Sequence, residues 1–155
     1  MAKQRDLVRM SEAEVAAFLA ECRNLQVATL GPDGAPHLTT VWFALHGGTI
    51  LFETYGKAQK VMNLNRDPRL AVLCEKGETY GELRGVSING RAEVIEDDPR
   101  RTELMRVLLD HHFPGQNAES LDAMAARMAS KRVVVAVHPE RVMSWDHRKL
   151  DGKGP

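Results

Sequence analysis

The chain changes from a strand pattern to a helix pattern within Thr49-Ile50-Leu51-Phe52-Glu53-Thr54-Tyr55-Gly56-Lys57-Ala58-Gln59-Lys60. The mostly apolar, β-favouring run Thr49–Thr54 predicts a strand, and the glycine that follows permits a sharp change of direction. A short helix is expected from about Lys57 to Asn65, because the downstream Asp67-Pro68 pair disfavours helical backbone. The stretch therefore predicts a strand–turn–helix unit in the middle of the chain.

Two lysines, Lys57 and Lys60, stand three positions apart at the start of this expected helix. Residues spaced i and i+3 lie on one face of a helix, so both ammonium groups would lie beside unpaired backbone N–H groups and the positive end of the helix dipole. This combination suits a phosphate group. The alternative is an ordinary amphipathic helix whose two lysines face water.

The charge balance of the chain argues against a polyanionic partner. The 155 residues hold 21 lysines and arginines against 21 aspartates and glutamates, so no overall field attracts nucleic acid or a membrane surface. There is no signal-peptide pattern and no apolar run of membrane-spanning length, so a cytoplasmic location is expected. Cys22 and Cys74 lack metal-ligand spacing, and the adjacent His111 and His112 diverge on a helix, so no metal site is expected.

The rest of the pattern indicates a β-rich fold. Expected helices begin at Ser11, where Ser11 and Glu14 form a capping-box pattern, at Pro99 and at Ser120, and expected strands cover 25–30, 36–45, 69–75, 83–95, 132–137 and 141–145. Hairpin-like links favour an antiparallel sheet, and closure hides its edges. We therefore expect a mainly β fold with α elements: a six- to seven-stranded antiparallel barrel with flanking helices, one domain over residues 1–150, and a flexible tail at 151–155.

Five segments in this order resemble the FMN-binding split-barrel superfamily, which includes pyridoxamine 5′-phosphate oxidase. They are Val27–Pro36, Thr39–Phe43, Lys57–Lys60 followed by Asn63–Arg69, Leu83–Val86 and Ser144–Arg148. Among its branches, the sequence is most similar to the flavin/deazaflavin oxidoreductases that use coenzyme F420. It lacks the C-terminal arginine and histidine pattern with which pyridoxamine phosphate oxidases hold their substrate, and only Lys57 and Lys60 replace the fuller basic clamp around FMN. The resemblance therefore favours F420 over FMN.

The resemblance implies a homodimer in which the cofactor ring lies across the second and third strands at the interface. The ring would face the backbone around Thr39, Thr40, Val41 and Trp42, the ribityl chain would run past Glu53, Thr54 and Tyr55, and the phosphate would be held by Lys57 and Lys60. The phosphate assignment agrees with the argument from the helix N-terminus.

Two further residues, Trp145 and Tyr80, have two interpretations each, and His37 has one. Trp145, near the end of the last strand, would reach the cofactor of the partner subunit or simply pack in the core or in an interface. Tyr80 would close a loop over the site or be an ordinary turn tyrosine. His37 is the nearest candidate for a proton donor, and no other catalytic residue is assigned. The function implied is an F420-binding oxidoreductase that passes a hydride from reduced deazaflavin to a small organic acceptor, and the alternative is a non-catalytic protein that sequesters F420, FMN or haem.

Overall fold

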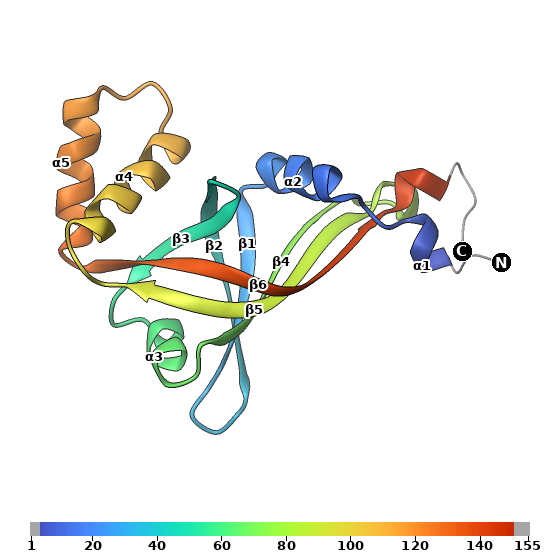
Figure 1. The fold of residues 1–155 in the computed structure, drawn as a ribbon, viewed down its shortest axis with the longest axis horizontal. Helices are drawn as coiled ribbons and strands as arrows, with labels where there is room; N and C mark the ends of the chain where they lie inside the picture. The colour runs from blue at the N-terminus through green and yellow to red at the C-terminus, as the bar shows by residue number, and fades with distance from the viewer. Residues whose placement is uncertain (1–3, 151–155) are drawn as a thin grey trace.

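Six antiparallel strands form a closed barrel in the computed structural model, which describes residues 4–150 (Figure 1). The order around the barrel is β1-β2-β3-β6-β5-β4, with β1 (Asn24–Leu30), β2 (Pro36–His46), β3 (Thr49–Tyr55), β4 (Arg69–Lys76), β5 (Arg84–Ile95) and β6 (Arg132–Asp146). The predicted fold class, an antiparallel β-barrel with flanking helices, is confirmed. The expected tail at 151–155 lies outside the described residues.

The last two expected strands are one strand, so the prediction of a break between 137 and 141 is wrong. β6 runs through Pro139 because the β5–β6 register shifts between Asn89 and Gly90, which places the proline at a bulge. A Cβ atom on Gly90 would lie 2.2 Å from the carbonyl oxygen of His138, so the close approach of the two strands requires glycine there. The predicted bend at Gly90 therefore keeps β6 continuous.

Five α-helices and two short 3₁₀ segments surround the barrel in the described part of the chain. They are α1 (Gln4–Leu7), α2 (Glu12–Glu21), α3 (Gln59–Arg66), α4 (Arg100–His112), α5 (Ala118–Ala129), η1 (Tyr80–Glu82) and η2 (His147–Leu150). The capping box that starts α2 is present, with the Ser11 hydroxyl accepting from the Glu14 N–H and the Glu14 carboxylate from the Ser11 N–H. Within residues 4–150, no helix has the length and apolar character needed to cross a membrane.

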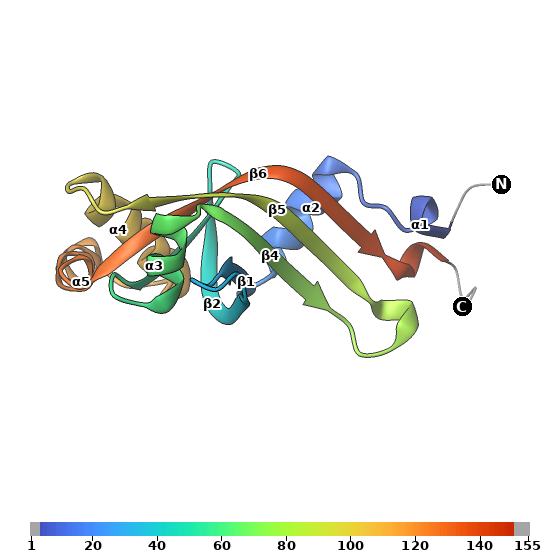
Figure 2. The ribbon, with the colours of Figure 1, turned by 90° about the horizontal axis from the view of Figure 1, so that it is seen from below.

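The core has two parts that share β3 and β6. The barrel interior is filled by side chains such as Leu25, Val27, Phe43, Phe52, Val72 and Val135, and it is closed by Phe18 and Leu19 of α2. The second part lies between the outer face of β3 and β6 and the paired helices α4 and α5. Figures 1 and 2 show these two helices at one end of the molecule and α1 with η2 at the other. The α4–α5 pair thus covers the barrel close to α3, where the candidate site lies.

Candidate functional site

The candidate site is the groove where the barrel wall opens between β2 and β3. These strands pair over only four positions, from Phe43 opposite Phe52 to His46 opposite Thr49. Beyond Phe43, residues 36–42 of β2 pair only with β1, and residues 53–55 of β3 pair only with β6. The two strands therefore diverge and leave an open edge on β2.

The open edge of β2 carries backbone groups without partners. The Phe43 N–H donates to the carbonyl oxygen of Arg23, on the side of β1. Because successive residues of a strand direct their N–H and C=O groups to opposite sides, those of Thr40 and Trp42 point the other way, into the groove. Within residues 4–150 these two N–H groups donate no hydrogen bond, so they are available to a ligand.

Seven of the predicted site residues meet in a groove pocket of about 360 Å³. Its lining consists of Thr40, Val41, Trp42, Glu53, Thr54, Tyr55 and Lys60, together with Asn24 and Arg132. The last two were not anticipated from the sequence. Arg132 lies opposite Tyr55 in the β3–β6 register, 77 positions later in the chain, and Asn24 lies opposite Trp42 in the β1–β2 register.

Arg132 organises one wall of the groove. Its guanidinium forms an ion pair with Glu53, with Nη1 2.6 Å from Oε2, and lies 4.0 Å from the centroid of the Tyr55 ring. Both side chains of the ion pair are largely shielded from solvent, which strengthens their attraction relative to a surface pair. The wall is therefore rigid, and it presents an aromatic face next to a fixed positive charge.

Lys60 places a second positive charge in the groove. Its Nζ atom donates to the Thr54 hydroxyl across 3.3 Å. Partial burial lowers the pKa of Lys60, and the nearby charge of Glu53 partly opposes that shift. An ammonium group that is poorly solvated and has no carboxylate contact within ion-pair distance in residues 4–150 is well placed to receive an anion.

Lys57 does not lie in the first turn of the helix, so that part of the prediction is wrong. The Ala58 N–H donates to the Tyr55 carbonyl in a turn, and α3 begins only at Gln59, which leaves Lys60 alone in the first turn. Lys57 lines an adjoining pocket of about 600 Å³ together with Arg101, Lys131 and Glu96, and this pocket shares Tyr55 and Arg132 with the groove.

Backbone donors connect the two pockets. The N–H groups of Lys57, Gln59 and Lys60 make no hydrogen bond to any described residue, whereas those of the next two residues donate to the Ala58 carbonyl. Unsatisfied N–H groups at a helix start favour an anion. The start of α3, with a lysine on either side, can therefore hold a phosphate even though the two ammonium groups do not share a helix face.

His37 and Thr39 lie farther along β2, on the side of the strand that faces the barrel interior. Their Nδ1 and Oγ1 atoms are buried and have no hydrogen-bond partner among residues 4–150. Thr29 of β1 lies opposite His37 and is hydrogen-bonded, because its hydroxyl accepts from the Asn63 side chain. Buried polar atoms without partners are rare in folded proteins, and here they lie along the open strand.

Trp42 is half exposed at the rim of the groove and packs against two cationic or titratable groups. The Arg23 guanidinium lies 4.0 Å from its ring centroid and the His112 ring 5.5 Å away. Burial lowers the pKa of His112 to about 4, and the neighbouring His111 and Arg23 add to the shift. The imidazole is therefore neutral at pH 7. The contact between this uncharged ring, at the end of α4, and Trp42 joins the helix to the groove.

Tyr80 and Trp145 lie outside the groove of their own chain. The Tyr80 hydroxyl accepts from the Gln4 side chain, and its ring packs against His147 at 4.6 Å. Trp145 lies flat over Gly85, where a Cβ atom would come within 2.1 Å of the indole. Both are at the end of the molecule formed by α1 and η2, so a role toward the cofactor would require a partner subunit.

Known proteins share the fold described above. Residues 11–146 match the family described as pyridoxamine 5′-phosphate oxidase. A conserved hypothetical protein of Mycobacterium tuberculosis is 42% identical, with a TM-score of 0.90 over 99% of this chain and 96% of that one. No curated protein sequence matched.

Two solved structures share the fold at lower identity. An F420 reductase is 23% identical, with a TM-score of 0.58 over 77% of this chain and 88% of that one. The haem storage protein HutZ of Vibrio cholerae is 17% identical, with a TM-score of 0.67 over 86% and 94%. The family match spans most of the chain, and the six-stranded split barrel agrees with it: the protein belongs to the pyridoxamine 5′-phosphate oxidase family.

Proposed function

We propose that the protein binds coenzyme F420 in the β2–β3 groove and transfers a hydride from the reduced deazaflavin to a small organic acceptor. The observation that carries the proposal is the open edge of β2, where the Thr40 and Trp42 backbone groups face a pocket that also contains the half-buried Lys60. Such an edge can hydrogen-bond the polar rim of a flat ring, and the cation can meet an anionic group on the same ligand.

The predicted ligand contacts follow the groove. The ring lies against the backbone of Thr39–Trp42, the ribityl chain passes Glu53–Tyr55, and the phosphate meets the N–H groups at the start of α3 between Lys57 and Lys60. F420 supplies the hydride chemistry when it is bound. The protein orients the ring and excludes water, and His37 is the candidate proton donor because its buried Nδ1 has no partner in the described chain.

The second pocket favours F420 over FMN. FMN ends at its phosphate, whereas F420 continues into a chain that carries several carboxylates. Beyond Lys57 the pocket adds Arg101 and Lys131, with Glu96 as its one acidic lining residue. Such a surface attracts an anionic extension. The shared fold with an F420 reductase adds support.

A homodimer is part of the proposal. Leu38 and Trp42 expose large apolar side chains on the same face of β2, and they are 67% and 47% accessible. Monomeric proteins rarely leave such residues grouped on a strand surface, and a second copy would cover them. Sedimentation at micromolar concentration should give the mass of two chains, and a monomer would count against the dimer.

The alternative is a protein that binds F420, FMN or haem without turnover. It is favoured by the engagement of Glu53 with Arg132, because Glu53 is the one carboxylate in the lining of the groove pocket and no histidine lines it. HutZ, a haem storage protein, has the same fold.

The two functions separate in one experiment. Purified protein is titrated with F420, FMN and haem, and then mixed with reduced F420 and a panel of quinones, enones and tetrapyrroles. We expect tighter binding of F420 than of FMN and protein-dependent oxidation of reduced F420 by at least one acceptor. Binding without oxidation by any acceptor would support sequestration, and preference for FMN would overturn the cofactor assignment.

A further inference from the structure

Asn63 is a buried polar residue in the middle of α3, and the ligand contacts proposed above do not include it. It is 0% exposed, and Thr29 of β1, which it contacts, is 2% exposed. A buried amide costs free energy unless its polar atoms are paired, and asparagine is a poor helix former. The contacts of this side chain therefore decide what it contributes to the protein.

The Asn63 amide joins both ends of α3 to the barrel. Its Nδ2 atom donates to the Thr29 hydroxyl across 3.0 Å, and its Oδ1 atom accepts from the Gln59 side chain across 2.8 Å. The Arg66 guanidinium donates to the same Oδ1 across 3.2 Å and also to the Leu30 carbonyl at the end of β1. Because Gln59 is the first residue of α3 and Arg66 is the last, one buried amide connects the whole helix to β1.

This connection replaces the N-cap side chain that α3 lacks. Ala58 occupies the N-cap position and has no side-chain oxygen, so it cannot accept from the N–H groups of the first turn. A capping side chain would fix this turn but would also occupy one of its donors. The bond from Gln59 to Asn63 fixes the turn from the barrel side instead. The first-turn N–H groups of Gln59 and Lys60 therefore stay available to a ligand while the turn itself is held in place.

We propose that Asn63 is a positioning residue for phosphate recognition: by holding Gln59, it keeps the first-turn N–H groups of α3 aligned for the cofactor phosphate. The inference rests on the proposed binding of F420 at the start of α3. Asn63 itself lines neither of the two pockets, so it acts through the helix and not by touching the ligand. Donors that are already ordered bind an anion more tightly than donors that must be ordered on binding. Loss of the Asn63 contacts should therefore weaken the hold on the phosphate and leave the contacts to the ring unchanged.

The test compares F420 with the deazaflavin fragment that ends at the ribityl chain and has no phosphate. Both ligands are titrated into the full-length protein and into the double variant Thr29→Val/Asn63→Leu. Valine and leucine have the same branched shapes as the residues they replace, and removing both partners leaves neither buried group of the pair unpaired, so the fold should be retained. We expect the wild-type protein to bind F420 at least about tenfold more tightly than the fragment. The double variant should bind F420 about tenfold more weakly than the wild type does, and the fragment within about twofold.

Two single variants separate positioning from stability. Asn63→Leu alone leaves the Thr29 hydroxyl buried without its partner, so it should lower the melting temperature more than the double variant does. Its loss of F420 affinity should nevertheless be the same, because both variants lack the bond to Gln59. Gln59→Ala removes the other end of that bond at an exposed position where alanine is a good helix former. It should weaken F420 binding and spare both the fragment and the melting temperature.

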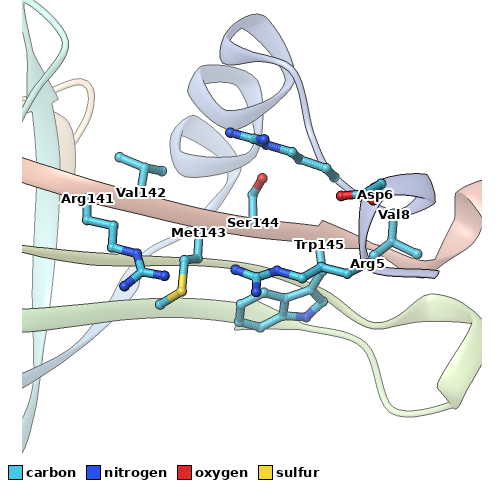
Figure 3. A pocket seen from close by; sticks show the side chains of 9 residues that line it. Arg5, Asp6, Val8, Arg141, Val142, Met143, Ser144 and Trp145 are labelled. Atoms are coloured by element: carbon cyan, nitrogen blue, oxygen red, sulfur yellow. The ribbon is translucent and has the colours of Figure 1, made fainter. Parts of the chain in front are cut away.

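The matched control is Ser144→Ala, which removes a part-buried hydrogen bond from the Met10 N–H at the opposite end of the molecule. Figure 3 shows the Ser144 hydroxyl pointing away from the Trp145 indole. This variant should leave both affinities within about twofold of the wild-type values, because distant sites act independently.

The outcomes distinguish the positioning role from the proposed function. Equal losses for F420 and the fragment in the double variant, or an unchanged F420 affinity, would overturn the role of Asn63 and leave the proposed function intact. A wild-type protein that binds F420 no better than the fragment would remove the phosphate contact, and one that binds neither ligand would refute the proposed function. In both of these cases the inference fails as well.

Discussion

The β5–β6 ladder and the β2–β3 ladder belong to the same barrel but differ threefold in length. β5 and β6 pair over twelve positions and absorb a bulge without interruption, whereas β2 and β3 pair over four and then separate. The long ladder satisfies its own backbone groups, and the short one leaves donors and a poorly solvated lysine beside a groove. The long ladder therefore stabilises the fold, whereas the short ladder leaves unpaired the backbone groups that the proposed binding site would use.

A substitution at Phe52, the last residue of β3 that pairs with β2, should have the largest effect on stability. Phe52 is fully buried opposite Phe43, while Tyr55, three residues later, is 55% exposed at the groove. Phe52→Ala should lower the free energy of unfolding by about 3–5 kcal/mol because it leaves a cavity. Tyr55→Ala should cost about 1 kcal/mol or less but weaken F420 binding. Urea denaturation of both variants checks this, and similar losses would contradict a boundary between core and groove.

Lys57→Ala tests whether the ligand-binding side of the boundary between core and groove contributes to F420 affinity. Removing a charge-assisted hydrogen bond to the phosphate should cost about 1.5–3 kcal/mol of F420 binding free energy, or roughly ten- to a hundredfold in affinity. The melting temperature should not change, because Lys57 is exposed and precedes the helix. Arg127→Ala is the control. An F420 affinity within twofold of wild type would remove Lys57 from the site, since exposed charges contribute little.

His112 should make stability depend on acid pH. Its pKa is about 4 in the folded protein, against about 6.5 when unfolded, so both states are neutral above pH 6.5. Below that pH the unfolded state takes up the proton first, and stability is lost as the pH falls toward 4. His112→Phe should remove about 1 kcal/mol of this loss, allowing for solvent screening. Unfolding curves between pH 7 and 4 check it, and an identical slope in both proteins would be the contrary result.

Lys60→Met should change stability only modestly, and in the favourable direction. Burial lowers the pKa of Lys60 in the folded state, so its charge opposes folding at pH 7, and this cost fades as the pH rises through the folded pKa. The variant should gain up to about 1 kcal/mol at pH 7 and less at pH 10, while F420 binding weakens. A loss of stability at pH 7 would show that the Thr54 contact outweighs the burial cost.

Local patterns were sufficient to predict most of the barrel and a role for Lys60 at the start of α3, whereas the other six predicted residues of the groove pocket came from the family resemblance. The alternation along 36–45 and the apolar run at 49–54 predict β2 and β3, and the capping box predicts the start of α2. These features depend on neighbours in the chain, so periodicity and turn residues reveal them.

Contacts distant in sequence could not be predicted in the same way. Arg132 reaches the groove only through the β3–β6 register, and the expected helix start failed because a turn that closes on Tyr55 delays α3 to Gln59. The expected break between 137 and 141 was wrong because nothing local shows that Pro139 lies opposite Gly90 at a bulge. Each of these outcomes is decided by a residue on another strand or by a turn that competes with the helix.

Amide hydrogen exchange, measured residue by residue with and without F420, tests the central claim most directly. If the open edge of β2 binds the cofactor ring, the N–H groups of Thr40 and Trp42 should exchange at least about tenfold more slowly when F420 is present. The Val86 amide in the β5–β6 ladder serves as the reference and should change little. Unchanged exchange at Thr40 and Trp42, under conditions where titration shows F420 bound, would place the cofactor elsewhere and contradict the account.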